Sequence, residues 1–522
     1  MKTQKTTKRL LGLVLIMMLV ISLLPLNALA AELPKASIMV SGGEENSTVV
    51  AYRLIDVSFD TATNSPQEPM YQWNSAVADW VSGLEAGKYI GTDNAVTDAF
   101  LQMDAAALAA FFDEAAARIR QGLMTPQASG SQTVDSSGNA TIANLDMGGY
   151  LVLVENGINI YRPSSANLIP VWDELNRQWK VENASLQLKH STPGITKKIK
   201  EAGGLVDVSH ASIGGTVTYD VVVDVPQYPS KALAKIFSVG DNLPAQLKLD
   251  GDSIKVFGVK PSTPEVNLTA DNSIKQYYQQ STSSPGSKNG TFVLTFDQSK
   301  VSDYQQLHIT YTAQLQAAAV PGDAYTNTAF LEYSNNPYEE GSYKVKEDDA
   351  TVYTFGIALT KEDEKTQAGL KDAKFSVADN QDNSDPLSFI KVTEGVYRCA
   401  LPNEVSAVTE LVTADAGKLE ITGLKPGTWY LTETEAPGGY VKLSTPVTAV
   451  LADEDRDGKL DNSEPDLNNT LSVYQVTVTN RQGFSLPKTG GIGTILFSAG
   501  GVVLAGMGVA IIFLYLQKKR RA

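Results

Sequence analysis

Three strand-like segments near the C-terminal end each bring one polar side chain to the end of an otherwise apolar row. Side chains on a strand alternate between two faces, so every second residue of 357–361, 429–433 and 476–480 shares a face. The polar residues that end these rows are Lys361, Glu433 and Asn480. Burial would leave a neutral, nucleophilic lysine amine and a protonated acid able to donate to the Asn480 carboxamide. The plainer interpretation is a buried salt bridge between Lys361 and Glu433.

The segment that contains Glu433 also carries a longer motif. Residues 429–440 read Trp-Tyr-Leu-Thr-Glu-Thr-Glu-Ala-Pro-Gly-Gly-Tyr, and they closely resemble the E-box of Cna-B-type domains in Gram-positive pilins and adhesins. Trp429 stands where tyrosine is usual. The resemblance implies an intramolecular isopeptide bond between Lys361 and Asn480, with Glu433 as the catalytic acid and one ammonia released. By analogy with a disulfide, closing so long a loop would stabilise the domain by about 4–5 kcal/mol.

A second set of the same residue types lies in the middle of the chain. Each member has apolar residues two positions away on the same strand face, and the members are Lys197, Asp241 and Asn327. The set resembles the other isopeptide domain type of pilin backbones, in which aspartate is the usual acid. The resemblance implies a bond from Lys197 to Asn327 promoted by Asp241. Lys198 competes, but its parity places it on the opposite face. The alternative is a solvated lysine at a strand start.

An acidic stretch near the C-terminal end matches a calcium-binding pattern. Residues 453–464 fit D-x-D-x-D-G-x₅-E at every constrained position, and Gly458 permits the sharp turn. The predicted ligands are Asp453, Asp455, Asp457, the Lys459 carbonyl, Asp461 and Glu464. The flanking residues have the pattern of strands rather than of EF-hand helices. Ca²⁺ would neutralise carboxylates that otherwise repel one another, and the alternative is a solvated acidic hairpin loop.

The C-terminus combines three features in a fixed order. A short motif precedes an apolar segment, residues 492–516, and a basic tail, residues 517–522. The motif is Leu486-Pro487-Lys488-Thr489-Gly490. The apolar segment is long enough to cross a bilayer, and the positive tail indicates that the bulk of the chain lies outside. The order resembles the sortase sorting signal of Gram-positive surface proteins, which implies cleavage between Thr489 and Gly490 and transfer to an amine.

The N-terminus has the pattern of a secretory signal peptide over residues 1–30. Basic residues precede an apolar run, residues 10–24, and Ala28-Leu29-Ala30 provides a small-x-small cleavage site. An N-terminal membrane anchor is the alternative, but the run is short for a bilayer span. We therefore expect cleavage after Ala30 and export.

The composition excludes several classes of function. The chain has 58 acidic and 43 basic residues and a net charge of −15, which argues against nucleic-acid binding. Its single cysteine, Cys399, permits no intrachain disulfide, and its three histidines have no metal-ligand spacing. No P-loop or GxSxG motif occurs, so a wall-anchored hydrolase would need a convergent site that the sequence does not reveal. We expect no enzyme activity and no required cofactor.

The remaining pattern predicts a mainly β chain of three domains. Short alternating runs separated by turn residues favour tandem immunoglobulin-like or Cna-type β-sandwiches over residues 192–355 and 356–484. Residues 31–191 are β-rich with a helical insertion at 104–120, where Asp104 is a plausible N-cap. We expect a rod with an N-terminal α+β domain and a C-terminal transmembrane helix.

Over its whole length the chain resembles the backbone subunits of sortase-assembled pili. In that family a lysine near the end of the N-terminal domain, in Trp-x-x-x-Val-x-Val-Tyr-Pro-Lys, attacks the threonine that sortase holds. The equivalent stretch here runs from Trp179 to Lys189 and lacks Val-Tyr-Pro. The resemblance implies Lys189 as the polymerising lysine, and the alternative is an exposed linker lysine.

The expected function is that of a structural shaft subunit, joined through Thr489 to a lysine of the next subunit or to the cell wall. The expected partners are sortase, other pilin subunits and peptidoglycan, and a host-surface ligand is a further candidate. The membrane is involved only through the C-terminal helix before processing. The alternative is a minor pilin or a monomeric wall-anchored adhesin that binds host or partner surfaces through its N-terminal domain.

Overall fold

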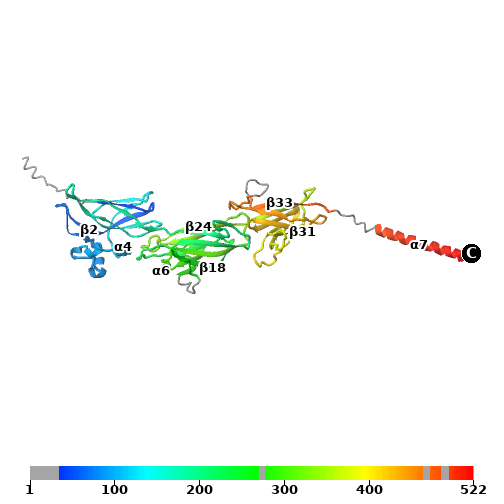
Figure 1. Ribbon diagram of the computed structural model, residues 1–522, viewed down its shortest axis with the longest axis horizontal. Coiled ribbons are helices and arrows are strands. Elements are labelled where there is room, and N and C mark those ends of the chain that lie inside the picture. Colours follow the sequence, from blue (N-terminus) through cyan, green and yellow to red (C-terminus); the bar gives the residue numbers. More distant parts are fainter. Residues whose placement is uncertain (1–33, 270–276, 462–470, 484–492, 521–522) are drawn as a thin grey trace, which may run out of the picture.

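The computed structural model describes residues 34–269, 277–461, 471–483 and 493–520. Three β-rich domains follow one another along a rod, and a separate long helix continues the chain beyond them (Figure 1). The predicted architecture, mainly β with a helical insertion near the N-terminus and an apolar C-terminal helix, is confirmed. The predicted signal peptide, residues 1–30, lies outside the described residues.

The N-terminal domain is built on two main sheets. Apolar residues of the central strands β2 and β6 are buried on both faces, since one face meets the smaller sheet and the other meets the helices. The larger sheet has the order β3(Ser65–Trp73)-β2(Thr48–Asp60)-β6(Gly148–Glu155)-β8(Ser164–Leu168), with β4(Ala128–Thr133) also paired to β2. The smaller sheet has the order β11(Ala184–Gln187)-β1(Ala36–Ser41)-β5(Ala140–Leu145). Two short pairs are β9(Pro170–Asp173) with β10(Gln178–Val181) and β7(Ile160–Tyr161) with β12(His190–Ser191).

The helical insertion covers one face of the larger sheet. Its main helix, α4 (Ala105–Arg120), begins where the Asp104 side chain accepts a hydrogen bond from the Ala107 N–H at 2.8 Å, so the predicted helix and N-cap are confirmed. Phe111 of α4 packs 5.0 Å from Phe100 and 5.6 Å from Trp73, ring centre to ring centre. The other helical pieces are α2 (Ser75–Ser82), η1 (Leu84–Gly87), η2 (Thr92–Asn94) and α3 (Asp98–Leu101).

The middle domain is a sandwich of two six-stranded sheets. On β22 every second residue is buried, so one face of the strand forms core and the other faces solvent. One sheet has the order β14(Gly204–Val206)-β13(Ile195–Glu201)-β16(Thr216–Asp224)-β22(Gln306–Leu315)-β18(Leu247–Val259)-β19(Val266–Asn267). The other has the order β15(Val208–His210)-β24(Lys344–Tyr353)-β23(Tyr325–Tyr333)-β17(Phe237–Asn242)-β21(Asn289–Phe296)-β20(Tyr278–Ser283). A short helix, α6 (Gln298–Val301), precedes β22.

The C-terminal sandwich is smaller, and its first and last strands are parallel neighbours. One sheet has the order β27(Phe389–Thr393)-β28(Val396–Cys399)-β30(Lys418–Leu424)-β25(Phe355–Asp363)-β33(Val473–Asn480). The other has the order β29(Leu411–Val412)-β26(Lys374–Ala378)-β31(Gly427–Glu435)-β32(Val447–Leu451), and a 3₁₀ turn, η3 (Asp415–Gly417), precedes β30. Only one residue separates the last strand of the middle domain from β25.

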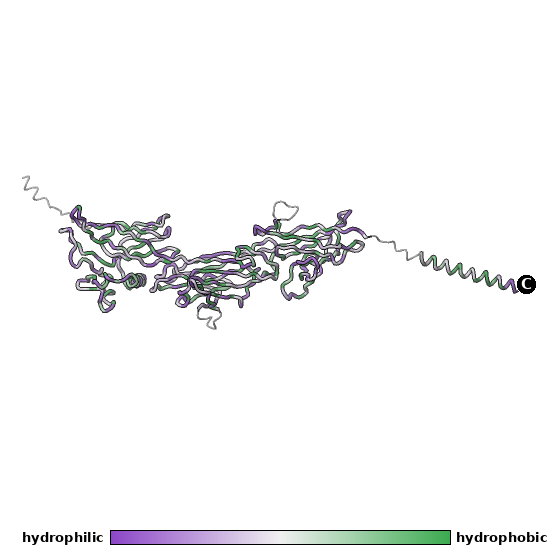
Figure 2. The backbone as a smooth tube through the Cα atoms, in the orientation of Figure 1, coloured by the Kyte–Doolittle hydropathy of each residue, from purple (hydrophilic) through white to green (hydrophobic). Residues whose placement is uncertain are grey.

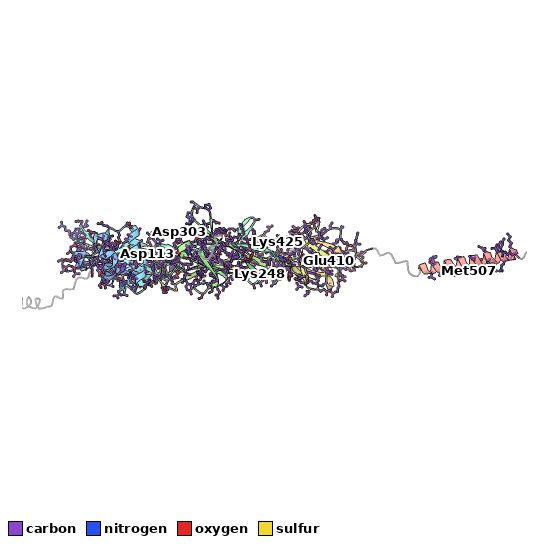
Figure 3. The ribbon with its side chains drawn as sticks, turned by 90° about the horizontal axis from the view of Figure 1, so that it is seen from below. Asp113, Lys248, Asp303, Glu410, Lys425 and Met507 are labelled. Atoms are coloured by element: carbon purple, nitrogen blue, oxygen red, sulfur yellow. The ribbon has the colours of Figure 1, made fainter. Side chains whose placement is uncertain are left out.

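Polar contacts hold consecutive domains together at both joints. At the first joint Asp113 of α4, labelled in Figure 3, accepts hydrogen bonds from the Tyr338 hydroxyl at 3.0 Å and the Ser230 N–H at 3.1 Å. At the second joint the backbone N–H of Lys425, in the C-terminal domain, donates to the hydroxyl of Ser212, in the middle domain, at 3.0 Å. These bonds fix the domains in a line rather than leaving them on free linkers.

The C-terminal helix α7 (Gly493–Arg520) stands apart from the three domains. In Figure 2 this helix is coloured mainly green, for hydrophobic residues, as far as its purple C-terminal end, whereas the strands of the domains mix green and purple. The segment Leu496–Arg520 has a mean hydropathy of 2.2 and is not buried inside the protein, and Met507 in Figure 3 lies on this isolated helix. Length and composition therefore suit the predicted membrane span.

Candidate functional site

The C-terminal cluster is assembled from both sheets of its sandwich. Strands β25 and β33 run parallel with Lys361 opposite Val478, which places Asn480 two residues further along on the same face. Strand β31 of the facing sheet brings Glu433 to the same point. All three polar side chains are almost completely buried, with at most 1% of each residue exposed.

The three groups of this cluster are in direct contact. The Lys361 amine donates to the Asn480 side-chain oxygen, and Lys361 Nζ lies 3.3 Å from Glu433 Oε1. Asn480 Nδ2 donates to the same Glu433 oxygen at 2.9 Å. The other Glu433 oxygen accepts the Leu443 N–H at 2.7 Å, which fixes the orientation of the carboxyl group. One carboxyl oxygen thus reaches both the attacking and the departing nitrogen.

Burial favours the chemistry that these contacts suggest. Removal from water lowers the pKa of the Lys361 amine below its ordinary value, more strongly than the neighbouring Glu433 raises it. The Phe375 ring, 5.8 Å from Nζ, forms part of the apolar surroundings. A neutral amine is a nucleophile, and the Asn480 carboxamide is the electrophile beside it. A carboxyl group in contact with both nitrogens can carry a proton from one to the other.

The middle cluster has the same groups in a different arrangement. Lys197 comes from β13 in one sheet, whereas Asp241 on β17 and Asn327 on β23 come from the other sheet. Lys197 forms a buried ion-pair contact with Asp241, and none of the three residues is more than 1% exposed. Lys198 points the other way and pairs with Asp207 at the surface, as its parity predicts.

A tyrosine that the sequence analysis did not single out completes the middle cluster. The Tyr311 hydroxyl on β22 contacts Lys197 Nζ at 2.6 Å, Asp241 Oδ2 at 2.5 Å and Asn327 Nδ2 at 2.9 Å. The signal was present in the sequence, because Tyr311 continues the inward row of Leu307 and Ile309 on a strictly alternating strand.

Burial shifts both members of the middle acid–base pair toward neutrality. It lowers the pKa of the Lys197 amine and raises the pKa of the Asp241 carboxyl, in each case against the opposing effect of the partner. The Lys197 amine also lies 4.7 Å from the centre of the Tyr219 ring. The surroundings therefore favour a neutral amine beside a protonated acid.

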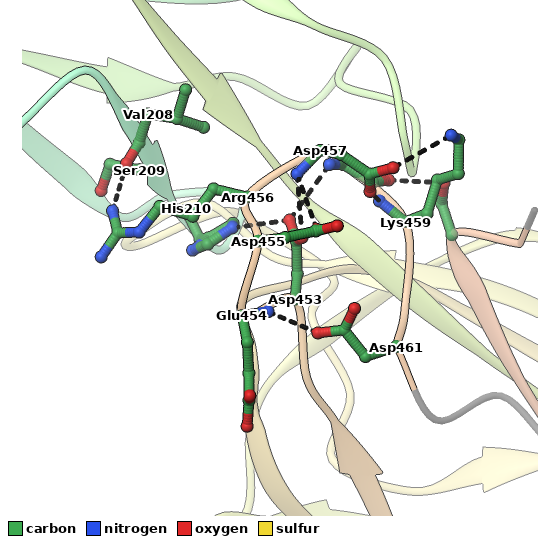
Figure 4. A network of polar contacts seen from close by, with 12 residues as sticks. Val208, Ser209, His210, Asp453, Glu454, Asp455, Arg456, Asp457, Lys459 and Asp461 are labelled. Atoms are coloured by element: carbon green, nitrogen blue, oxygen red, sulfur yellow. Dashed lines mark hydrogen bonds and ion pairs between the residues drawn. The ribbon is translucent and has the colours of Figure 1, made fainter. Parts of the chain in front are cut away.

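The predicted calcium loop is only partly assembled. Oxygen atoms of three predicted ligands lie within 4.8 Å of one another, and these are Asp453, Asp455 and Asp461. Asp457 instead accepts the Lys459 N–H at 2.8 Å and pairs with the Lys459 amine at 3.0 Å, as Figure 4 shows. Glu464 lies outside the described residues.

The same loop contacts the middle domain. Asp453 Oδ2 lies 2.9 Å from His210 Nε2 (Figure 4). Arg456 pairs with Glu201 at 2.9 Å. Arg456 also donates to the Val208 carbonyl. The loop is therefore part of the joint between the two sandwiches as well as a candidate cation site.

The predicted polymerisation residues lie at two different places. Lys189 is exposed between β11 and β12, and its backbone carbonyl accepts the Arg162 N–H at 2.9 Å. Its side chain is thus accessible while its backbone is held at the end of the N-terminal domain. The sorting motif, Leu486 to Gly490, lies outside the described residues.

Comparison with known proteins finds family matches in two parts of the chain. Residues 355–464 match the family described as SpaA, a prealbumin-like fold domain, and residues 479–522 match the LPXTG cell wall anchor motif. The trypsin-resistant surface T6 protein of Streptococcus pyogenes serotype M6 is 26% identical over 396 residues, which cover 64% of this chain and 70% of that protein.

Solved structures extend the similarity to the rest of the chain. The T6 backbone pilin of S. pyogenes serotype M6 superposes with a TM-score of 0.58 at 17% identity, covering 87% of this chain and 99% of that chain. The full-length major pilin SpaD of Corynebacterium diphtheriae matches with a TM-score of 0.47 at 16% identity, over 86% and 98% of the two chains. The chain is therefore a cell-wall-anchored surface protein with an LPXTG signal and the modular fold of a backbone pilin.

Proposed function

We propose that this protein is the shaft subunit of a covalent pilus, with two internal isopeptide bonds that strengthen each copy. The observation that carries the proposal is the repetition of a buried lysine–asparagine–acid cluster in two consecutive domains of an anchored rod. The similarity to the T6 protein and to the T6 backbone pilin supports the same function.

The isopeptide reaction needs no further reactant. The lysine Nζ forms a bond to the asparagine Cγ, the Cγ–Nδ2 bond breaks, and ammonia leaves with one proton taken from the amine. In the C-terminal domain Glu433 Oε1 would transfer that proton, because it lies 3.3 Å from the amine and 2.9 Å from the departing nitrogen. Folding supplies the proximity that makes the reaction intramolecular.

Polymerisation would join the two ends of neighbouring copies. Sortase cleavage between Thr489 and Gly490 leaves a thioacyl enzyme, and the Lys189 amine of another copy would displace the enzyme thiol to form an amide. The middle and C-terminal sandwiches follow the N-terminal domain along the rod (Figure 1). Lys189 precedes both sandwiches in the chain, so this bond joins copies head to tail. A head-to-tail contact that does not close on itself generates an open fibre.

The test of polymerisation is the ladder of high-molecular-weight species in extracts of cell-wall protein. Lys189→Ala should abolish the ladder while the protein still reaches the surface. Lys180→Ala is the matched control, since Lys180 is also a surface lysine but is engaged with Asp173 and Glu182. An unchanged ladder in Lys189→Ala would exclude this lysine as the acceptor, and a wild-type chain that never forms a ladder would exclude the shaft function.

One feature of the N-terminal domain favours the adhesin as the second candidate. A hollow of about 260 Å³ lies between the helical insertion and the larger sheet, with the aromatic side chains of Tyr71, Trp73, Phe100, Phe112 and Tyr150 in its wall. A monomeric adhesin would keep its surface binding in Lys189→Ala, and substitutions in this hollow would abolish that binding.

We also propose that the loop at 453–464 holds Ca²⁺. The proposal is supported by the motif and by the three carboxylates whose oxygen atoms lie close together. Ca²⁺ at one hundred times its dissociation constant would stabilise the C-terminal domain by about 2.7 kcal/mol. Ca²⁺ should raise the thermal transition of the wild type and not that of Asp455→Asn, which lacks one of the clustered carboxylates. A wild-type transition that Ca²⁺ does not raise, or an equal rise in Asp455→Asn, would exclude the site.

A further inference from the structure

Tyr311 contacts every reacting group of the middle cluster. Its hydroxyl accepts from Lys197 Nζ at 2.6 Å and from Asn327 Nδ2 at 2.9 Å, and it donates to Asp241 Oδ2 at 2.5 Å. The residue is 1% exposed, and burial raises the pKa of its hydroxyl well above the ordinary value. The phenol therefore stays protonated while it sits between the amine, the acid and the amide nitrogen.

The C-terminal cluster explains why such a group is needed. There Glu433 reaches both nitrogens with one oxygen. In the middle cluster the Tyr311 hydroxyl is hydrogen-bonded both to the Asp241 carboxyl and to the Asn327 side-chain nitrogen. A proton that leaves the Lys197 amine through Asp241 reaches the departing nitrogen by way of Tyr311.

The cluster is also poorly explained as a purely structural network. Asp241 Oδ1 and Asn327 Oδ1 are buried and have no hydrogen-bond partner among the described residues. Leaving such an atom unsatisfied costs about 1–3 kcal/mol. An arrangement selected only for stability would satisfy both oxygens, whereas here the satisfied contacts are those that connect the two nitrogens through the acid and the phenol.

We propose that Tyr311 is the proton relay of the middle domain and a catalytic residue for the bond between Lys197 and Asn327, an inference that rests on the proposed isopeptide chemistry. Nζ attacks Cγ, and the carbonyl π bond opens. Tyr311 passes its proton to Nδ2, Asp241 restores that proton to Tyr311, and Asp241 then takes one proton from Nζ. The carbonyl π bond re-forms as the Cγ–Nδ2 bond breaks and ammonia leaves, so one proton moves from Nζ to Nδ2 and both relay groups regain their starting forms.

The test follows bond formation over time in the full chain. Newly made protein is pulse-labelled, chased and digested, and the linked peptide that contains Lys197 and Asn327 is measured. General acid–base groups contribute typically 10²- to 10⁴-fold, so Tyr311→Phe should slow this bond by at least about 100-fold. The bond between Lys361 and Asn480 in the same molecules is the internal standard and should form at the wild-type rate.

Tyr219→Phe is the matched control variant. Tyr219 stacks on Tyr311 with ring centres 5.2 Å apart and is equally buried, but among the described residues its hydroxyl forms no hydrogen bond with Lys197 or Asp241. We expect it to form the middle bond at the wild-type rate. Equal rates for Tyr311→Phe and the wild type would overturn the relay while leaving the isopeptide proposal intact. A wild-type middle domain that never forms the bond would instead refute the proposed function of this cluster.

If Tyr311→Phe shows no cooperative thermal unfolding, the variant is not correctly folded and its rate cannot test the relay. A second replacement serves in that case. Tyr311→3-fluorotyrosine keeps the ring and the hydroxyl but makes the hydroxyl more acidic. Because the rate of proton transfer depends on the acidity of the transferring group, this replacement should change the rate of the middle bond and not that of the C-terminal bond. An unchanged rate would also overturn the relay.

Discussion

The middle and C-terminal sandwiches each contain a buried lysine, asparagine and acid. The two clusters join different parts of their sandwiches. In the C-terminal domain Lys361 and Asn480 lie on neighbouring parallel strands of one sheet, and only the acid comes from the facing sheet. In the middle domain Lys197 and Asn327 lie in opposite sheets. A bond in the first case fastens two strands edge to edge, whereas a bond in the second fastens the two layers of the sandwich.

The difference matters for how each domain carries tension along the rod. Pulling enters the middle domain at β13 and leaves through β24, and it enters the C-terminal domain at β25 and leaves through β33. With both bonds formed, the load would pass from Lys197 to Asn327 and from Lys361 to Asn480. Residues 198–326 and 362–479 would then lie outside the loaded path, so either geometry protects most of its domain.

The largest expected effect is on stability. Asn480→Ala removes the electrophile of the C-terminal pair and should destabilise that domain by about 4–5 kcal/mol, with the middle domain unchanged. Asn327→Ala should destabilise the middle domain by a similar amount and leave the C-terminal domain unchanged, because the stabilisation grows only with the logarithm of loop length. Calorimetry of the full chain would resolve the two transitions.

Thr479→Ala is the control for the stability measurement. Thr479 is exposed and precedes Asn480 on the same strand, so its removal should change stability by less than about 0.5 kcal/mol. If Asn480→Ala behaves like Thr479→Ala, the C-terminal cluster is only a polar contact. If only one of the two asparagine variants is destabilised, only that domain forms an isopeptide bond, although both domains contain the same kind of cluster.

The next effect concerns the two acids. Glu433→Gln and Asp241→Asn keep the shape of each side chain and remove its ability to transfer a proton. Each should slow the bond of its own domain by about 10²-fold or more and leave the other bond unchanged. Linked-peptide analysis during a chase would measure both bonds in one sample, and normal formation in either variant would rule out the acid assigned to that domain.

The smallest expected effect is a pH dependence confined to the middle domain. A hydrogen bond from His308 to Asp220 at 2.7 Å raises the pKa of the imidazole above 6.5. The raised pKa means that stability is fully present below pH 6.5 and is lost as the pH rises through the folded pKa. The loss should be about 1 kcal/mol or less, since the histidine is partly exposed.

The C-terminal domain provides the contrast for this prediction, because all three histidines precede residue 309 and His308 lies in the middle domain, while only His210 reaches the C-terminal domain, through Asp453 at the joint. Raising the pH from 6 to 8 should therefore lower the unfolding temperature of the middle domain and leave that of the C-terminal domain unchanged. Calorimetry would measure both. His308→Gln should remove the dependence. A dependence that persists in this variant would assign the titration to another group.

The sequence was most informative where strand parity decides the outcome. Alternation correctly placed Lys361, Asn480 and Glu433 in the core and separated inward Lys197 from outward Lys198. Parity does not specify which sheet a strand joins, so the cross-layer arrangement of the middle cluster required the structure.

The sequence could not predict which segments, distant in the chain, come into contact. Tyr311 reaches the middle cluster from a strand whose partners are fixed by tertiary packing, and only its inward position is encoded locally. The acidic loop is similar, since its motif does not reveal that Asp453 meets His210 of the preceding domain. Local patterns therefore predicted the reactive residue types, and tertiary structure determined which of them meet.

The most direct test of the account is the intact mass of the full chain after any signal-peptide cleavage. Two intramolecular isopeptide bonds predict a mass about 34 Da below that calculated from the sequence, because folding brings each pair together to expel one ammonia. The double variant Asn327→Ala/Asn480→Ala should show no deficit relative to its own calculated mass. A wild-type mass equal to the calculated value would contradict the central claim, and a deficit of about 17 Da would restrict it to one domain.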